Sequence, residues 1–287
     1  MAYQYIHAEE HGKVLVLRMD DPATRNSMRS EMSTELLTEI ARFEKSSKLR
    51  CLVLTGTDPS FCAGANVGGL QRSMERSEEQ KQVSVEEEAP PLPWAALDAR
   101  CSQRATDPAA DLGPAIVTVL MRLQKPSIAA VNGYALGVGS GAALSCDIRI
   151  ASEKGSFAET FIQRGLPPGD GSCWQLPRMI GLSNTYLQAY TGDRVDAETA
   201  LRWGLVSKVV PHDQLMKTTL ELATRLAEGP VYSMGLIKYL IQQSTNMTFE
   251  ESLRLGRAAL AVARGTADHK EGVQSFLEKR PPHFQGR

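Results

Sequence analysis

A stretch of twenty residues without a charged side chain, Ser127–Cys146, constrains the fold of this chain more than any other feature. It begins with a short apolar run, Ser127–Val131, that has the length of a buried strand. Asn132 and the glycines at positions 133, 137, 139 and 141 then interrupt the apolar pattern. Because a membrane-spanning helix needs about 20 predominantly apolar residues in a row, the stretch predicts a buried strand followed by a tight glycine-rich turn.

Strand and helix patterns alternate over the first two thirds of the chain. Residues 13–19 and 50–55 have the pattern of buried strands, and apolar residues at helical spacing lie between them, after Ser30 as an expected N-cap. Residues 116–123 and 139–145 have helical patterns, and a strand is expected over 147–151. Alternating strands and helices predict an α/β fold.

The last third has only helical patterns. The apolar residues that share one helical face are Leu215, Leu222, Ala223 and Leu226. Thr248 and Glu251 form a capping-box pattern, and Asp268 precedes a final helix. We therefore expect an α/β core over residues 1–205 and a helical C-terminal region over 206–287.

Residues 71–112 are rich in glutamate and proline and have no sustained apolar period. This pattern is typical of a mobile surface insertion, and the alternative is a flap over a substrate site, since long loops in compact domains are often functional. The two interpretations remain open at this stage.

Charge and cysteine content exclude several classes. Lys and Arg total 32 and Asp and Glu total 33, so the net charge is −1, without the basic field of a nucleic-acid-binding protein. The five cysteines form no C-x-x-C pair, which predicts neither a disulfide framework nor a metal site. Residues 1–10 lack the pattern of a signal peptide. A cytoplasmic protein that does not associate with membranes is expected.

Two glycine-rich turns, residues 60–66 and 132–141, follow predicted strands and precede helices. Such turns present backbone N–H groups at a helix N-terminus, where they can stabilise a developing oxyanion. Gly137, Gly139 and Ala142 also fit a dinucleotide-binding pattern. However, Asn132–Leu136 separates the strand from the first glycine, and the pattern lies in the middle of the chain, so a nicotinamide site is not favoured.

Several segments in order along the chain resemble the crotonase, or enoyl-CoA hydratase/isomerase, family. They are LTGTD (54–58), SFCAGANV (60–67), KPSIAAVNGYALGVGSGAALSCDIRIAS (125–152), GLPPGDGSCWQLPRMIG (165–181), TGDRVDAETALRWGLVSKVV (191–210) and FLEKRPPHF (276–284). The resemblance implies a spiral of ββα units that form two roughly perpendicular sheets, followed by a helical trimerisation region. It also implies a homotrimer or a dimer of trimers.

The resemblance also implies the binding residues. An acyl-CoA thioester carbonyl would lie between the backbone N–H groups of Ala65 and Val138. The residues that match the family's contacts with coenzyme A and the rest of the substrate are Arg25, Ala63, Ala65, Asn66, Val67, Phe276 and Lys279. Coenzyme A would be part of the substrate, and no separate cofactor is expected.

The sequence departs from the family pattern at the acid–base residues. A typical hydratase uses two glutamates for general acid–base catalysis, but Gly141 and Phe161 stand at the matching positions. The remaining candidates for proton transfer are Asp170, in the turn PPGDGS, and Glu159. Asp170 could instead act as an Asx-turn or helix-capping residue, and Glu159 as a structural one.

These observations predict an acyl-CoA enzyme of the hydratase/isomerase type that works through a thioester enolate without the two-glutamate mechanism. One alternative is a C–C bond hydrolase of a β-diketone or cyclic ketone, similar to 6-oxocamphor hydrolase. The other is a non-catalytic binding member of the family.

Overall fold

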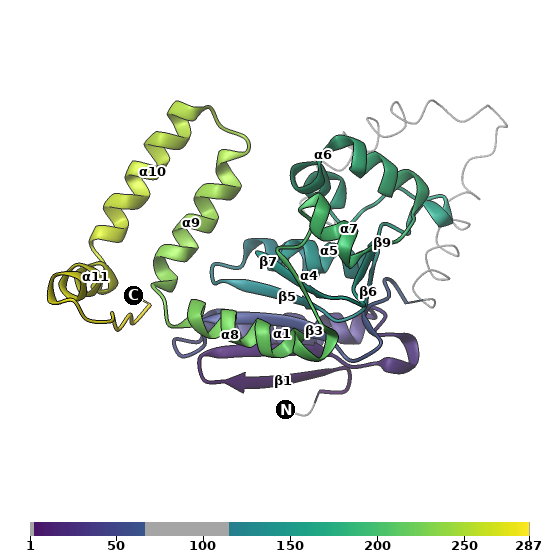
Figure 1. Ribbon diagram of the computed structural model, residues 1–287, viewed down its shortest axis with the longest axis horizontal. Helices are drawn as coiled ribbons and strands as arrows, with labels where there is room; N and C mark the ends of the chain where they lie inside the picture. Colours follow the sequence, from purple (N-terminus) through teal and green to yellow (C-terminus); the bar gives the residue numbers. More distant parts are fainter. Residues whose placement is uncertain (1–2, 67–114, 287) are drawn as a thin grey trace, which may run out of the picture.

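The computed structural model describes residues 3–66 and 115–286, and two sheets form its body (Figure 1). The larger sheet has the order β1 (Ile6–His11), β2 (Val14–Met19), β3 (Cys51–Gly56), β5 (Ser127–Val131), β7 (Ile148–Ser152) and β10 (Lys208–Val210). The smaller sheet has the order β4 (Ser60–Cys62), β6 (Tyr134–Leu136), β8 (Ser156–Ala158) and β9 (Val195–Asp196). The pairs β1–β2 and β8–β9 are antiparallel, and all other neighbours are parallel.

The helices of the body are α1 (Ser30–Lys45), α4 (Ala115–Arg122), α5 (Val138–Ser145), α6 (Ser172–Thr191), α7 (Ala197–Trp203) and α8 (Leu215–Ala227). Short 3-10 turns lie at Pro22–Thr24, Ile162–Arg164 and His212–Gln214. The helix α1 begins one residue earlier than expected: Ser30 is its first helical residue, and Arg29 occupies the N-cap position without a capping side chain.

A repeated ββα unit generates both sheets. In β5–β6–α5 and again in β7–β8–α6, the first strand joins the larger sheet and the second joins the smaller one. The chain turns sharply between them: a Cβ atom at Gly133 would collide with the carbonyl of Pro59, so only glycine fits this corner. The expected α/β spiral of ββα units is confirmed.

Buried apolar residues cover both faces of the larger sheet. Leu15 and Leu17 of β2 point into the cluster that includes α1, α4 and α5, whereas Val14 and Val16 point into a second cluster that α8 closes. Because both faces of the sheet are buried, the sequences of these strands are continuous apolar runs. The strand β10 is part of this sheet, and the helix α8 packs against it. Both elements follow residue 205, where the sequence predicts that the α/β core ends, and that boundary stays a prediction.

The helices α9 (Val231–Ser244), α10 (Phe249–Arg264) and α11 (Ala267–Glu278) complete the described chain. Figure 1 shows α9 and α10 as a helical hairpin that stands apart from the two sheets. Thr248 and Glu251 form the predicted capping box of α10. Among the helices of residues 3–66 and 115–286, none is long and apolar enough to cross a membrane. Val67 and the expected insertion 71–112 lie outside the described residues.

Candidate active site

The two glycine-rich turns leave the smaller sheet side by side. Their preceding strands, β4 and β6, are parallel neighbours, with Cys62 paired to Ala135. Beyond the strands the two backbones remain close, because a Cβ atom at Gly64 would lie 2.9 Å from the carbonyl oxygen of Leu136. The sheet therefore brings together two turns that are far apart in the sequence.

The backbone at Ala65 leaves its N–H group available on one side of the turn. The Met28 N–H donates to the Gly64 carbonyl (2.7 Å), and the Asn66 N–H donates to the Met28 carbonyl (3.2 Å). In such a parallel bridge the N–H of the middle residue points away from the partner segment. The N–H of Ala65 therefore points away from Met28.

Val138 is the first residue of α5, and it follows Gly137, which has a positive φ of 50°. Gly137 is held by the smaller sheet, since its own N–H donates to the carbonyl of Ala158 (2.9 Å). The first N–H groups of a helix have no acceptor within the helix. The Val138 N–H is therefore presented, together with the positive end of the helix dipole, at the turn that neighbours Ala65.

Asp170 lies in the turn before α6, and only 1% of its surface is exposed. Its Oδ1 accepts hydrogen bonds from the Ser172 backbone N–H (3.2 Å) and hydroxyl (2.7 Å), as an Asx-turn requires. Its Oδ2 has no hydrogen-bond partner among the described residues. One oxygen therefore serves the local structure, and the other is unsatisfied.

The unsatisfied oxygen of Asp170 lies against Gly141. A Cβ atom at Gly141 would be 2.6 Å from Oδ2 and 3.0 Å from Cγ of Asp170. The carboxyl group of Asp170 thus fills the space that a side chain at position 141 would need. Burial raises the pKa of this carboxyl group above its ordinary value, against the smaller lowering effect of the Ser172 hydrogen bonds.

Glu159 follows β8 and is completely buried. Neither of its carboxyl oxygens has a hydrogen-bond partner among the described residues. Burial raises the pKa of Glu159 well above its ordinary value, and the nearby charge of Asp170 raises it further. The hydroxyl groups of Ser140 and Ser172 lie near enough to oppose this shift without forming a hydrogen bond to either oxygen.

A cavity of about 250 Å³ between α4 and α6 borders Asp170 but not Glu159. Its other lining residues are Val117, Thr118, Met121, Arg122, Gly171, Trp174 and Gln175. The sequence did not identify Gln175, whose Nε2 donates to the Ser145 hydroxyl (3.0 Å) while its buried Oε1 has no partner in the described chain. No sequence signal pointed to Gln175, because Asp170 precedes α6 and a spacing of five residues does not match the helical i,i+3 or i,i+4 pattern.

Among the predicted binding residues, Arg25, Ala63, Ala65 and Asn66 lie together. The Arg25 carbonyl accepts a hydrogen bond from the Ala63 N–H (3.1 Å), and the Asn66 side chain donates to the Ser27 hydroxyl (3.1 Å). The Arg25 side chain is exposed.

Phe161 packs beside the second turn. A Cβ atom at Gly137 would lie 3.6 Å from the Phe161 ring, which can transfer no proton.

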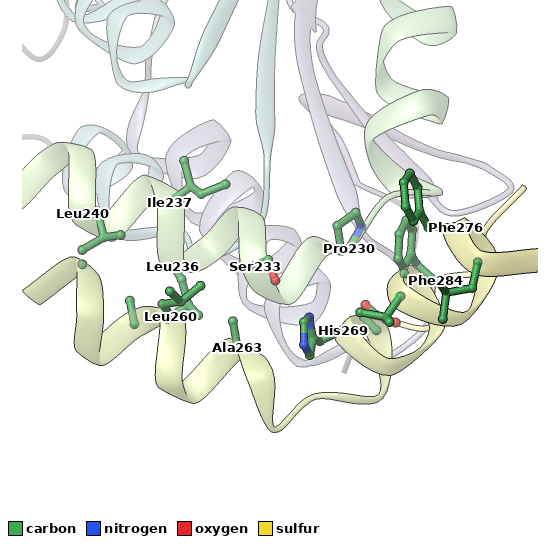
Figure 2. Close-up of a pocket in the computed structure, with 16 residues that line it drawn as sticks. Pro230, Ser233, Leu236, Ile237, Leu240, Leu260, Ala263, His269, Phe276 and Phe284 are labelled. Carbon is green, nitrogen blue, oxygen red and sulfur yellow. The ribbon is translucent and has the colours of Figure 1, made fainter. Parts of the chain in front are cut away.

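Phe276 and Lys279 lie at the end of α11, and neither borders the cavity beside Asp170. Phe276 is 82% exposed and lines a separate apolar cavity of about 660 Å³ formed by α9, α10 and α11 (Figure 2). Within one chain, the structure therefore divides the predicted substrate contacts between two places.

A Ser–His–Asp arrangement elsewhere is structural. His212 lies 3.2 Å from the Ser152 hydroxyl and 3.0 Å from the Asp58 carboxylate. Ser152 is completely buried and donates to the Asn132 carbonyl, so its oxygen cannot reach a substrate. Within residues 3–66 and 115–286, no group of three or more His, Cys, Asp or Glu side chains could hold a metal ion.

Two glycine turns that meet at one edge of the smaller sheet, with carboxyl groups buried behind them, define an α/β protein of the crotonase fold. The chain belongs to the enoyl-CoA hydratase/isomerase family, whose model matches residues 9–91 and 103–287.

Relatives and solved structures match almost the whole chain. The 1,2-epoxyphenylacetyl-CoA isomerase of Escherichia coli K12 is 33% identical, over 99% of each chain. The 2,3-dehydroadipyl-CoA hydratase of the same organism is 30% identical, over 96% of each chain. The crystal structure of an enoyl-CoA hydratase from Bacillus anthracis is 28% identical, has a TM-score of 0.79, and matches 99% of this chain and 100% of its own.

Proposed function

We propose that this acyl-CoA-processing enzyme forms a thioester enolate, with the thioester oxygen held by the backbone N–H groups of Ala65 and Val138. When a proton leaves the carbon next to the thioester, negative charge develops on the carbonyl oxygen. Preorganised N–H donors stabilise such charge by about 3–4 kcal/mol each. The neighbouring turns, the outward N–H of Ala65 and the helix N-terminus at Val138 support this assignment.

Asp170 is the acid–base residue of this proposal, and the observation that carries it is the position of its unsatisfied Oδ2 against Gly141. The two-glutamate hydratase mechanism has no carboxyl group at positions 141 and 161 in this chain. Burial raises the pKa of the Asp170 carboxyl group, so its carboxylate is a stronger base than that of an ordinary aspartate and can serve as a general acid–base group.

A second candidate function is cleavage of a C–C bond in a β-diketone or cyclic ketone. The turn PPGDGS around Asp170 favours it, because the sequence of this turn resembles that of the C–C bond hydrolases in the family. This reaction also passes through an enolate and would use the same N–H groups.

The proposed partners are an acyl-CoA thioester and further copies of the same chain. Arg25 and Lys279 carry the positive charges proposed for the phosphates of coenzyme A. Large exposed apolar side chains on α9, α10 and α11 support a homotrimer or a dimer of trimers. The free, buried thiols of Cys51, Cys62 and Cys146 support a reducing, cytoplasmic location.

Exchange of the α-protons of butyryl-CoA in D₂O, followed by NMR, tests the proposal without knowledge of the natural acyl group. Enolate formation should replace these protons with deuterium far faster than in buffer alone, and free coenzyme A should inhibit the exchange. A thermal-shift titration with coenzyme A runs beside it. Binding without exchange would indicate a non-catalytic family member, and hydrolytic cleavage of a cyclic β-diketone without exchange of butyryl-CoA would favour the hydrolase.

A further inference from the structure

Four polar residues, Asp58, Asn132, Ser152 and His212, form a hydrogen-bonded corner network across three corners of the ββα spiral. Asp58 lies between β3 and β4, Asn132 lies between β5 and β6, and Ser152 ends β7 before the turn into β8. In the short turn after β10, Nε2 of His212 lies 3.0 Å from Oδ2 of Asp58, and its Nδ1 lies 3.2 Å from the Ser152 hydroxyl. The network therefore joins residues that are far apart in the sequence.

On the buried side of the corner network, Ser152 fixes the role of Nδ1 of His212. Ser152 is completely buried, and its hydroxyl donates its one hydrogen to the Asn132 carbonyl (3.0 Å). The hydroxyl oxygen accepts from the Lys154 backbone N–H (3.2 Å) and has a second lone pair for Nδ1. Because the hydroxyl has no further hydrogen to give, Nδ1 must be the donor.

On the exposed side, Asp58 fixes the role of Nε2. Burial opposes ionisation of this carboxyl group, but hydrogen bonds from Asn132 and His212 lower its pKa below the ordinary value, so it is ionised at neutral pH. An ionised carboxylate only accepts hydrogen bonds, so Nε2 must donate as well. Every hydrogen bond of the corner network is therefore formed when His212 is an imidazolium, with a proton on both nitrogens.

A neutral imidazole breaks one of these bonds, because it has one donor and one acceptor. If Nδ1 gives up its proton, the Ser152 hydroxyl must turn away from the Asn132 carbonyl to donate to the ring. If Nε2 gives it up, a lone pair of the ring faces the carboxylate of Asp58. Loss of the proton therefore opens the corner network, whichever nitrogen releases it.

The corner network reaches the two strands that lead to the oxyanion turns. Nδ2 of Asn132 donates to Oδ1 of Asp58 (2.8 Å) and to the carbonyl of Ser60 (3.3 Å), the first residue of β4. The strand β4 leads to the turn of Ala65, and β6, which begins two residues after Asn132, leads to the turn of Val138. A shift of these corners would therefore move the two N–H groups relative to each other.

We propose that His212, in its doubly protonated form, is a positioning residue for the oxyanion site, because it fixes the corners from which the turns of Ala65 and Val138 extend. It acts through Asp58 and Asn132 and contacts no substrate. This inference rests on the proposed function of the two N–H groups. Its contribution is complete at low pH and is lost as the pH rises and His212 releases one proton.

The charged groups around His212 are exposed. Asp58 is the acid in contact with the ring, and 62% of its side chain is exposed. Lys154, in the turn after β7, lies near enough to Asp58 to favour the ionised carboxylate. Glu153 and Asp213, which adjoin Ser152 and His212 along the chain, are exposed as well. Since solvent weakens such charges, the hydrogen bonds of the buried Ser152 carry the proposal.

NMR of the substrate-free protein tests the positioning directly. Isotope-labelled histidine reports the protons of His212, and labelled alanine and valine report the backbone N–H signals of Ala65 and Val138. Both backbone signals should shift as His212 loses its proton, and these shifts should be absent from His212→Phe. His11, which faces Glu9 on β1, gives the matched control, because His11→Phe should behave as wild type. Backbone signals that do not follow the titration of His212 would overturn the proposal.

The pH profile of butyryl-CoA exchange separates positioning from a purely structural role. The ratio of the wild-type rate to that of His212→Phe cancels the titration of Asp170. This ratio should fall by about tenfold as His212 loses its proton, since a misplacement of about 1 Å can cost about 100-fold. A ratio that is constant with pH would overturn the proposal.

Asp58→Asn should rescue the activity at high pH. Its amide oxygen can still accept from Asn132, and its amide N–H can donate to Nε2 of a neutral His212, while Nδ1 donates to Ser152. The variant should therefore keep the exchange rate where wild type loses it, and a loss equal to that of wild type would contradict the assigned donors. Backbone shifts without any exchange would reject the proposed function alone, whereas exchange without these shifts would reject the role of His212 alone.

Discussion

The carboxyl group of Asp170 has two oxygens with different environments, and this asymmetry makes Asp170→Asn informative. The amide oxygen of asparagine can keep both hydrogen bonds from Ser172. Proton transfer would be lost, so we expect the rate of butyryl-CoA exchange to fall by about 10²–10⁴-fold with little change in melting temperature. If Asp170 were only a turn residue, both the rate and the melting temperature would remain near wild type.

Glu159 should make the stability of the protein depend on pH. Its pKa in the folded state lies well above the ordinary value of 4.5. The folded protein therefore holds a proton that the unfolded chain releases, so this stabilising contribution is complete below pH 4.5 and is lost as the pH rises toward the folded pKa.

Glutamine at position 159 removes this titration. The free energy of unfolding of Glu159→Gln relative to wild type should increase from about pH 4.5 upward, by at most about 1.4 kcal/mol per pH unit. Urea unfolding at several pH values measures it. A difference that stays constant with pH would mean that the folded and unfolded states bind this proton equally.

The N–H group of Val138 can be deleted without removing its place in the fold. Val138 is the first residue of α5, the helix position where proline is best tolerated. Val138→Pro should therefore keep the helix but lose one oxyanion donor, and the exchange rate should fall by about 10²–10³-fold. Val138→Ala keeps the N–H and should retain most of the rate. Equal rates in the two variants would exclude Val138 from the oxyanion site.

Helices and strands could be predicted from the sequence where a periodic apolar pattern or a glycine-rich turn extended over enough residues. The strand over 127–131 and the helical run after Gly137 were identified because an apolar run and a glycine cluster mark them. The three-residue strands β6 and β8 were not, since three residues show no alternation. These short strands form the smaller sheet, so its register could not be deduced locally.

The candidate site was predictable residue by residue but not as an arrangement. Asp170 and Glu159 stood out because Gly141 and Phe161 are unable to transfer protons. The close approach of Asp170 to Gly141 arises because the turn before α6 packs against α5, two elements that successive ββα units bring together. Sequence spacing alone carries no information on such a contact.

The capping box of α10 makes a prediction at the level of one helix. Thr248 accepts from the Glu251 N–H (3.3 Å), and Glu251 accepts from the Thr248 N–H (2.8 Å). Thr248→Ala should destabilise this helix end by about 1 kcal/mol, whereas Thr248→Ser should keep the cap. Hydrogen exchange of the first turn of α10 measures the effect, and equal protection in the two variants would contradict it.

The three C-terminal helices of the described chain expose many large apolar side chains. On α9, α10 and α11 the large exposed apolar side chains include Ile237, Ile241, Phe249, Leu253, Leu260, Val273, Phe276 and Leu277. Contiguous exposed apolar patches of this kind mark association surfaces. The proposed trimer or dimer of trimers would bury them, and light scattering measures its mass.

Association would also explain why predicted substrate contacts lie at two places in one chain. Asp170 borders one cavity, whereas Phe276 lines another and Lys279 is the C-cap residue directly after α11. If a complete site combines Asp170 of one chain with Phe276 and Lys279 of its neighbour, two defective variants should complement each other. One variant carries Asp170→Asn, and the other carries Phe276→Ala with Lys279→Ala.

Each variant alone should exchange butyryl-CoA poorly at low substrate concentration, the first because proton transfer fails and the second because binding weakens. Random co-assembly after co-expression should restore about a quarter of the sites, since half the chains supply an intact acid and half an intact binding surface. Mixing the two variants after assembly provides the control, because closed oligomers that do not exchange subunits regain nothing. Activity that never exceeds the sum of the separate variants would place the complete site within one chain.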